Sequence, residues 1–372
     1  MRGWGFGAVL VFWVCLLSAC TVVVPGAVSG PEPDLGADVL FMGEIPEYGQ
    51  QWSATDKTRL AYTRALRRID PCGFRDALSG IGQPGAVDFR FWECEIELKV
   101  PGHSDIRVQV GLIYSTVQSR FERLVYDMGD AKVYESSLSE CVYEVPLALD
   151  KLPGAPELTG DKQPLLQVVV HEFDDSGLGI CTIGLPVATA IAKRMPHGIP
   201  VRTALSAYPS KLAERDPCEI LKEYPDKVRN LGQDKDAGSA NGDFPFECAF
   251  SLETPDDAGM EYSVGIDVSY LGLLELEGYS TVRREGIDYY YNEVPQQFVG
   301  CKAAVLLGDP LYKRDSAGNL IEDARDAKRR ASVTVMARAA GSGIGYGGTT
   351  TSCGKLRDLA DKSGLIFRDS AR

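Results

Sequence analysis

Asp70-Pro71-Cys72 occurs twice in this chain, the second time as Asp216-Pro217-Cys218. A short carboxylate suits the N-cap of a helix, because it accepts the orphan amide hydrogens of the first turn. Proline suits the first helical position, where no amide hydrogen is missed. Each copy therefore predicts a short helix that holds a cysteine in its first turn. A catalytic aspartate is the alternative, but a helix cap accounts for all three residues together.

Two blocks of similar layout extend outward from these copies. Before each copy, helical spacing indicates a helix, and Ser53 with Asp56 resembles a capping box. After each copy, alternating residues predict an antiparallel hairpin, then a third strand, a fourth strand and a closing helix. In the first block we expect a helix at 53–69, strands at 89–98, 106–114, 141–149 and 165–172, an irregular helical or loop segment at 115–128, and a closing helix at 182–195. In the second block we expect a helix at 203–215, strands at 244–252, 262–270, 301–307 and 331–339, an irregular helical or loop segment at 271–284, and a closing helix at 354–362.

These elements predict the α+β class, with two tandem homologous domains. Each domain is expected to be an antiparallel sheet with flanking helices and two disulfides. The domains are expected at 51–197 and 198–372, because Pro196 to Pro200 contains both common helix stoppers. A length of 372 residues fits two domains of ordinary size, and 44% hydrophobic residues is typical of folded protein.

The first 19 residues are expected to be a signal peptide. Arg2 precedes an apolar run from Trp4 to Leu17, which is too short and too early for a membrane span. Leu17-Ser18-Ala19-Cys20 resembles a bacterial lipobox, in which Cys20 becomes lipidated, with palmitate among its acyl chains. Two or three such chains anchor a protein stably. The alternative is an ordinary signal peptide with Cys20 incidental. Residues 20–50 are expected to be a flexible tether, of which 39–48 is apolar enough to pack on the first domain.

The cysteines support export to an oxidising compartment. Cys15 leaves with the signal, and eight cysteines remain besides Cys20, four in each block. An even number in an exported chain predicts disulfides, and a closest spacing of 22 residues does not fit a zinc site. Four cysteines allow three connectivities per block. Their places at helix and strand starts favour Cys72–Cys94, Cys141–Cys181, Cys218–Cys248 and Cys301–Cys353.

The lipobox, the tether, the Asp-Pro-Cys helix start and the order of the four cysteines resemble an actinobacterial envelope lipoprotein family of unknown function. The cysteine layout is also similar to extracytoplasmic sensor domains of some mycobacterial Ser/Thr kinases. The resemblance covers about residues 55 to 368 as two copies. It implies an envelope location and a disulfide-bonded α+β domain, and it implies no activity.

Side chains suited to catalysis or to cofactors form no convincing constellation. His103, His171 and His197 lack metal spacing, so we predict no metal site. Gly343 to Gly348 matches G-x-G-x-x-G, but antiparallel strands precede it, and a loop that lets Cys353 reach its partner is preferred over a dinucleotide site. We predict no cofactor. The acidic residues Asp174, Asp175, Asp256, Asp257, Glu275 and Glu277 are expected to be solvated, with a weak calcium site as the alternative.

Tyr289-Tyr290-Tyr291 is the candidate binding residue set. In a strand, Tyr290 would face opposite to its two neighbours. Exposed tyrosines would suit a recognition surface, but rings packed at a sheet edge are the favoured interpretation.

A formal net charge of −13 disfavours nucleic acid as a partner. We expect a protein that is anchored to the cell membrane through Cys20, on its extracytoplasmic face, and that is not an enzyme. Its expected role is to bind a ligand or an envelope protein, in the groove between the repeats or at the three tyrosines. A carrier of a small molecule or lipid, with an apolar cleft between sheet and helices, is the second hypothesis. A hydrolase that uses carboxylates alone is the third.

Overall fold

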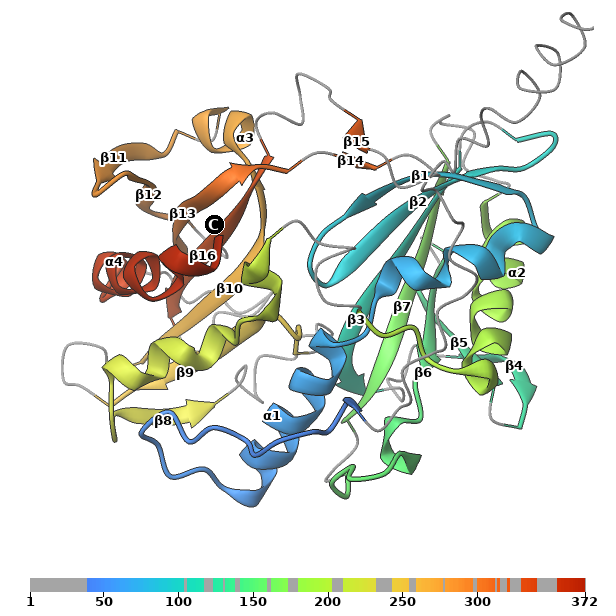
Figure 1. Ribbon diagram of the computed structural model, residues 1–372, viewed down its shortest axis with the longest axis horizontal. Helices are drawn as coiled ribbons and strands as arrows, with labels where there is room; N and C mark the ends of the chain where they lie inside the picture. Colours follow the sequence, from blue (N-terminus) through green and yellow to red (C-terminus); the bar gives the residue numbers. More distant parts are fainter. Residues whose placement is uncertain are drawn as a thin grey trace, which may run out of the picture. The chain divides into compact units, whose positions relative to one another are not determined.

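A computed structural model shows two antiparallel sheets and the helices that cover them (Figure 1). The structure describes residues 39–103, 106–116, 123–129, 131–137, 141–158, 162–172, 180–202, 210–231, 243–253, 259–276, 278–296, 300–311, 313–314, 320–321, 329–339 and 353–371. The expected signal peptide, Cys20, most of the tether and the glycine-rich loop at 343–348 lie outside these residues. No helix in the described part of the chain is long and apolar enough to cross a bilayer.

The first sheet contains seven strands from the first half of the chain, in the order β1-β2-β3-β7-β6-β5-β4. The strands are β1 (Gln83–Phe89), β2 (Glu93–Lys99), β3 (Ile106–Thr116), β4 (Arg123–Met128), β5 (Ala131–Ser137), β6 (Val142–Pro146) and β7 (Lys162–Glu172). The helices of this half are α1 (Ala54–Arg67), η2 (Pro71–Gly80), η3 (Leu149–Lys151), α2 (Ile180–Arg194) and η4 (Met195–His197), of which η2, η3 and η4 are 3₁₀ helices.

The second sheet contains seven strands in the order β8-β9-β10-β16-β13-β12-β11. They are β8 (Val228–Leu231), β9 (Glu247–Leu252), β10 (Met260–Tyr270), β11 (Ser280–Arg284), β12 (Ile287–Gln296), β13 (Gly300–Pro310) and β16 (Arg329–Ala339). The helices are η5 (Lys211–Glu214), η6 (Pro217–Glu223), α3 (Leu271–Leu276), α4 (Leu356–Phe367) and η10 (Arg368–Ala371). The two remaining strands, β14 (Lys313–Arg314) and β15 (Leu320–Ile321), extend the first sheet, because Arg314 pairs with Val87 of β1.

The strand orders of the two sheets match position by position. β3 and β7 are central in the first sheet, as β10 and β16 are in the second. The disulfides also match. In each half, one disulfide joins the start of a 3₁₀ helix to the second strand of that half, β2 or β9. The other joins a cysteine at the start of β6 or β13 to the region where the closing helix begins. The four bonds are Cys72–Cys94, Cys141–Cys181, Cys218–Cys248 and Cys301–Cys353, which are the four pairings favoured by the sequence.

The Asp-Pro-Cys copies form the helix starts that were expected from their chemistry. Asp70 Oδ1 accepts a hydrogen bond from the Cys72 amide at 2.9 Å, and Asp216 Oδ1 accepts one from the Cys218 amide at 3.0 Å. Both helices are 3₁₀ helices. Ser53 and Asp56 form a complete capping box at the start of α1. Local cap chemistry therefore defines the start of all three helices.

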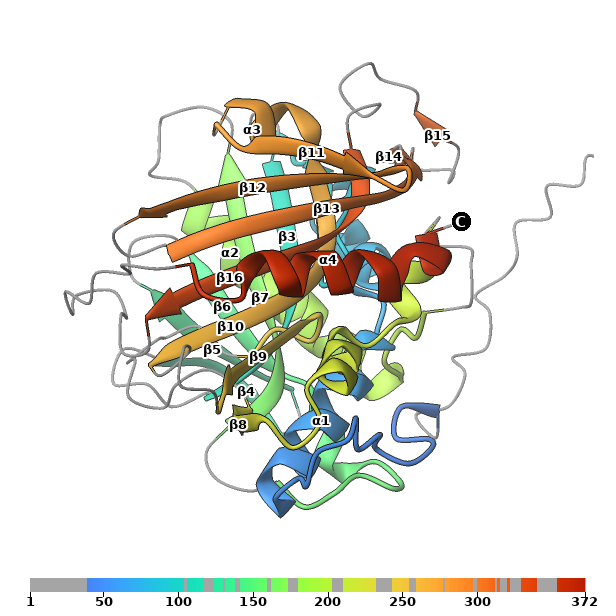
Figure 2. The same ribbon diagram turned by 90° about the vertical axis from the view of Figure 1, so that its left-hand side faces the viewer.

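Each sheet packs one face against its closing helix. α2 packs on the first core, which includes Val108, Val110 and Val168, and α4 packs on the second core, which includes Val264 and Val335. Figure 2 shows α4 on the near side of the second sheet, with the first sheet behind that sheet. The sheet faces that point away from α2 and α4 are turned toward each other, although α3 covers the part of the second face near Tyr290 and Leu306. Specific contacts between these faces are given below.

Helix α1 contributes to both cores. Leu60 belongs to the second core, whereas Tyr62, Ala65 and Leu66 belong to the first. Val39 to Gln50 also pack, since Leu40 enters the first core, and the Gln50 amide donates to the carbonyls of Leu221 and Tyr224. The expectation that the apolar stretch 39–48 packs on the first domain is therefore confirmed, and residue 50 is too late as the end of the expected tether.

Several strand predictions are wrong. The expected strand at 89–98 is interrupted by a turn in which Arg90 and Glu93 exchange backbone hydrogen bonds, so Phe89 ends β1 and Glu93 begins β2. The region 115–128 contains strand β4, and 271–284 contains helix α3 followed by strand β11. β1, β5, β8 and β12 are additional strands. β1 contains Pro84 and Gly85, residues that usually argue against a strand, which explains why alternation did not identify it.

Candidate functional site

The sheet faces that point away from α2 and α4 bring buried charged groups together where the two sheets meet. Along β2, Cys94 and Ile96 enter the first core, so Glu93 lies on the opposite face. Along β10, Ile266 and Val268 enter the second core, so Asp267 lies on the opposite face. Burial raises the pKa of Glu93, and the charge of Asp267 from the other sheet raises it further.

Arg329 of β16 makes the most deeply buried charged contact. Its side chain is 1% exposed, and its Nη2 lies 2.5 Å from Asp88 Oδ1 of β1. The same nitrogen donates to the Phe89 carbonyl at 2.9 Å. The guanidinium lies over the rings of Phe89 and Tyr270, with distances to the ring centres of 5.7 and 5.3 Å. Arg329 thus joins the start of β16 to the end of β1 through charge, hydrogen bonding and ring contact.

The charge balance of this cluster favours a bound proton. We call Asp88, Glu93, Asp267, Arg90 and Arg329 the inter-sheet cluster. It holds three carboxyl groups and two guanidinium groups, so full ionisation leaves one negative charge uncompensated. Burial raises the pKa of Asp267, although Arg90 and a hydrogen bond from the Trp92 side chain oppose the rise. Burial also raises the pKa of Glu93, and a hydrogen bond with Gln109 and the charge of Arg90 oppose it.

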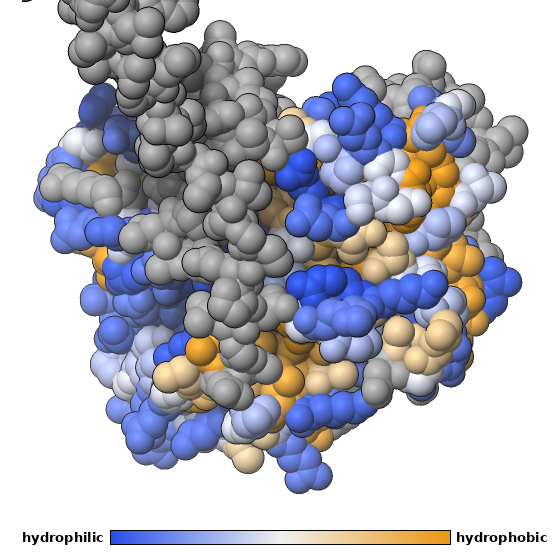
Figure 3. Space-filling model, turned by 45° about the vertical axis from the view of Figure 1, so that its right-hand side comes forward, coloured by the Kyte–Doolittle hydropathy of each residue, from blue (hydrophilic) through white to orange (hydrophobic). Residues whose placement is uncertain are grey.

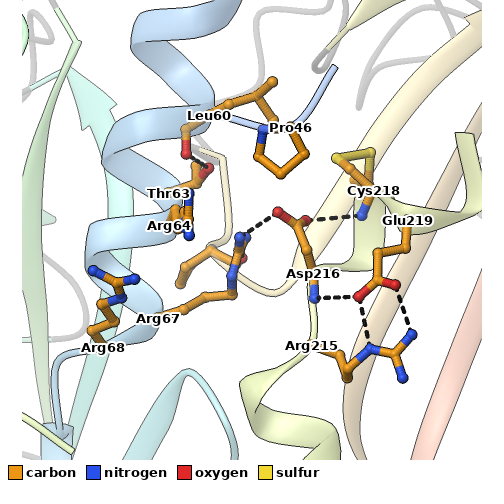
Figure 4. A network of polar contacts seen from close by, with 12 residues as sticks. Pro46, Leu60, Thr63, Arg64, Arg67, Arg68, Arg215, Asp216, Cys218 and Glu219 are labelled. Atoms are coloured by element: carbon orange, nitrogen blue, oxygen red, sulfur yellow. Dashed lines mark hydrogen bonds and ion pairs between the residues drawn. A yellow bond between two sulfur atoms is a disulfide. The ribbon is translucent and has the colours of Figure 1, made fainter. Parts of the chain in front are cut away.

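A second charged contact lies between α1 and η6 (Figure 4). Arg67 Nη2 is 2.5 Å from Asp216 Oδ2, and Arg67 Nη1 donates to the Pro245 carbonyl at 2.8 Å. Asp216 therefore caps its own helix with one oxygen and binds Arg67 with the other. Glu219 completes the group, because it accepts from the Asp216 amide and binds Arg215 through both oxygens at 2.7 and 2.6 Å.

A third contact centres on Asp243, just before β9. Asp243 Oδ2 is 2.8 Å from Arg59 Nε of α1 and 3.4 Å from Lys162 Nζ of β7. The backbones of Asp243 and Tyr114 exchange two hydrogen bonds, of 2.8 and 3.0 Å. Beside this contact, Arg59, Arg67 and Glu247 line a cavity of about 30 Å³, which has room for about one water molecule. Burial raises the pKa of Glu247.

Three larger surface hollows lie elsewhere. One of about 290 Å³ is formed by residues 40–45, α1, Gly154 and Pro156. One of about 630 Å³ lies beside η2 and the β2–β3 turn, and one of about 420 Å³ lies beside Gly286, Gly308 and Arg368. Neither Glu93 nor Asp267 lines any of these hollows or the small cavity. Among the described residues, the groups that act on Glu93 and Asp267 include Arg90, Gln109 and Trp92 of the protein itself.

All three tyrosine rings are buried, so the packed arrangement that the sequence favours over a recognition surface is confirmed. Tyr289 and Tyr291 stack with ring centres 6.3 Å apart, and the Tyr291 hydroxyl donates to Asp361 of α4 at 2.7 Å. Tyr290 faces the other way, as alternation requires, and packs with Leu274 and Leu306. α4 covers one face of β12, and the residues around α3 cover the other.

The space between each sheet and its closing helix is filled where the two approach. A Cβ atom added to Gly184 of α2 would lie 2.6 Å from the Tyr143 ring. A Cβ atom added to Gly364 of α4 would lie 2.4 Å from the Tyr289 hydroxyl. These contacts leave no room for a ligand at either point, so an apolar cleft is not found there.

The other candidate groups stay apart or lie outside the described residues. His171 contacts Gln109 at 3.4 Å, whereas His103 lies in the β2–β3 turn and His197 ends the 3₁₀ helix η4. Among the described residues, no group of three His, Cys, Asp or Glu side chains could hold a metal ion. Asp174, Asp175, Asp256, Asp257 and Glu277 lie outside those residues. The inter-sheet cluster itself was missed, and its only sequence signal is the presence of Glu93, Asp267 and Arg329 at strand positions between apolar residues.

Comparison with known proteins adds little to this description. No protein-family model and no curated protein matches the chain. Among solved structures, the crystal structure of the di-domain ARO/CYC BexL from the BE-7585A biosynthetic pathway aligns with 82% of this chain and 96% of its own length. The identity is 8% and the TM-score is 0.15, a similarity too low to carry an argument about fold or function.

Proposed function

We propose that this chain is a lipid-anchored envelope protein on the extracytoplasmic face of the cell membrane, which binds a ligand or an envelope protein without catalysis. The lipobox at Cys20 and the resemblance to an actinobacterial lipoprotein family motivate the anchor and the location. Four disulfides are consistent with an oxidising compartment. Matching strand orders and disulfides support two homologous domains that arose by duplication.

The observation that carries the non-catalytic proposal is the placement of the inter-sheet cluster. Carboxyl groups with shifted pKa values indicate an active site when they line a cleft that a substrate can enter. Here Glu93 and Asp267 lie between two sheets and line none of the hollows described above. Their partners are Arg90, Trp92 and Gln109 of the protein itself. This arrangement serves to hold the two sheets in one relative position, as a rigid binding platform requires.

A carrier or sensor of a small amphiphile is the second candidate. The hollow of about 290 Å³ favours it, because that volume is near the lower end of ligand sites and the lining combines apolar groups with Lys57 and Arg64.

Native mass spectrometry of the lipoprotein purified from its own envelope tests the proposal. We expect retained protein partners or a bound compound that denaturation releases, together with an acylated Cys20 peptide. A chain without acyl groups, without partners and without bound compound would contradict the proposal. Turnover of an envelope substrate that Glu93→Gln or Asp267→Asn abolishes, while each variant keeps its fold, would show that the protein is an enzyme.

A further inference from the structure

The segment that enters the described fold is held on α1 by arginines. Arg68 donates hydrogen bonds to the carbonyls of Val39, Leu40 and Met42, and Arg64 donates to the Glu44 carbonyl at 2.6 Å. Leu40 fills the first core, so the segment is fixed at its start.

These arginines keep their charge uncompensated. Backbone carbonyls satisfy their hydrogen bonds without neutralising them, and neither guanidinium lies within 4.0 Å of a carboxylate in the described part of the chain. Burial lowers the pKa of Arg68, and the positive charges of Arg64 and Arg67 lower it further. Exposed Lys57 lies about two helical turns before Arg64 and lines the same hollow. The lining of the hollow thus has one basic residue more than acidic ones, on a chain whose formal net charge is −13.

Apolar side chains accompany this charge. Met42 is 57% exposed, one of few large apolar side chains so exposed, and it lines the hollow with Phe41 and Ile45. Glu44 is the one acidic residue among the lining residues, against Lys57 and Arg64. On the face of the molecule in Figure 3, apolar areas lie between strongly polar ones. Exposed apolar groups beside basic ones are typical of a surface that lies on an anionic membrane.

We infer that this surface, formed by Met42, Lys57, Arg64 and the hollow between them, docks on the anionic headgroups of the membrane to which Cys20 is anchored. The inference rests on the proposed anchor. Val39 follows Cys20 by 19 residues, which span at most about 70 Å, and Val39 begins the segment that forms the surface. The part of the fold next to the anchor in sequence is therefore the part that carries the lipid-compatible chemistry. The remaining surface is left free for partners.

Vesicle co-sedimentation tests the inference without the acyl anchor. The chain from residue 20 with Cys20→Ser keeps every described residue and is mixed with vesicles of phosphatidylcholine, with or without phosphatidylglycerol. We expect binding only to vesicles with phosphatidylglycerol, and weaker binding at higher salt. Met42→Glu with Lys57→Glu should weaken it by about tenfold or more, since each basic residue near such a surface contributes on the order of a few-fold. Arg64 is kept because it holds the entering segment.

The matched control is Met128→Glu with Lys227→Glu. It makes the same charge change at an exposed methionine of β4 and an exposed lysine before β8. This control should bind like the unsubstituted chain. Equal loss in both variants, equal binding to both vesicle types, or binding to an envelope protein through Met42 and Lys57 would overturn the inference. The mass of the Cys20 peptide is measured separately, so a failed anchor with intact vesicle binding is distinguishable from a failed surface.

Discussion

Arg67 of α1 and Asp216 of the second Asp-Pro-Cys copy lie 2.5 Å apart, and both side chains are mostly buried. Asp216 also caps the helix that carries Cys218, so one carboxylate orders a helix start and fixes it to α1. The repeated tripeptide thus has a structural role in the second block that extends to the first. Together with Arg329 and Asp88, this pair holds the two halves of the chain in contact.

Arg67→Ala should destabilise the protein by about 3–5 kcal/mol, because it leaves the Asp216 carboxylate buried without its partner. Urea unfolding measures this change. Arg123→Ala is the matched control, since Arg123 pairs with Glu135 but is 70% exposed, and its loss should cost under about 1 kcal/mol. Equal losses of stability for the two substitutions would show that the buried Arg67 contact contributes no more than an exposed ion pair.

The inter-sheet cluster should make stability fall as pH rises. Burial raises the pKa of Glu93 and of Asp267, so the folded state binds these protons more tightly than the unfolded state does. Their favourable contribution is complete below the ordinary carboxyl pKa and is lost as pH rises through the raised values. Asp267→Asn, which cannot ionise, should therefore flatten this part of the stability profile measured by thermal unfolding.

Glu293→Gln should affect the pH dependence of stability in the opposite direction to Asp267→Asn. A hydrogen bond from Arg357 lowers the pKa of Glu293, so its contribution is present at neutral pH and is lost in acid. This variant should change the acid side of the profile and leave the neutral side unchanged in slope. If Asp267→Asn also changed only the acid side, the assignment of a proton to the cluster would be wrong.

Gly364→Ala should cost on the order of 1–3 kcal/mol, because the added methyl group would overlap the Tyr289 hydroxyl. Tyr289→Phe removes the nearest atom and should recover part of the loss when the two changes are combined. Gly80→Ala is the control, since a Cβ atom there meets nothing within 4 Å. Additive effects of the two changes at positions 364 and 289 would contradict direct packing between α4 and β12.

Replacing both cysteines of one bond by serine should cost on the order of 3–4 kcal/mol for Cys72–Cys94 and about the same for Cys218–Cys248, in the chain-entropy model. The two loops have similar sequence separations of 22 and 30 residues. Denaturant unfolding of the two double variants checks the equality. A tenfold difference in the equilibrium constant would show that the two Asp-Pro-Cys modules are not equivalent in their stability.

Local chemistry made part of this fold predictable. The caps at Asp70, Asp216 and Ser53 follow from short-range geometry that residue types specify directly. The four disulfide pairings were favoured from the places of the cysteines at helix and strand starts, and the structure has the same four pairs. The strand pair β11–β12 was missed although Glu285 and Gly286 both have positive φ, as a tight hairpin turn requires. Gly286 is a typical turn residue, but glutamate rarely adopts the left-handed conformation, so Glu285-Gly286 does not stand out in the sequence as a hairpin turn.

The candidate site could not be predicted from the sequence, because it consists of contacts between distant residues. Glu93 and Asp267 lie 174 residues apart in the sequence, and each occupies a position of its strand that points away from the core of its own half. Such a position predicts a solvated side chain when one sheet is considered alone. Only the second sheet turns that outward face into an interior one. The same limit applies to Tyr289 and Tyr291. Strand alternation places their rings on one face of the strand but does not show whether that face is covered, and it is α4 that buries them.

The central claim is that charged contacts between the two halves of the chain, Arg67 with Asp216 and Arg329 with Asp88, join both halves into one unit suited to binding. Differential scanning calorimetry of the disulfide-intact chain tests it most directly, with Arg67→Ala combined with Arg329→Ala as the comparison. The account predicts one cooperative transition for the unsubstituted chain and two resolved transitions for the variant, because each half keeps its own core and disulfides. Two resolved transitions already in the unsubstituted chain, or one unchanged transition in the variant, would contradict it.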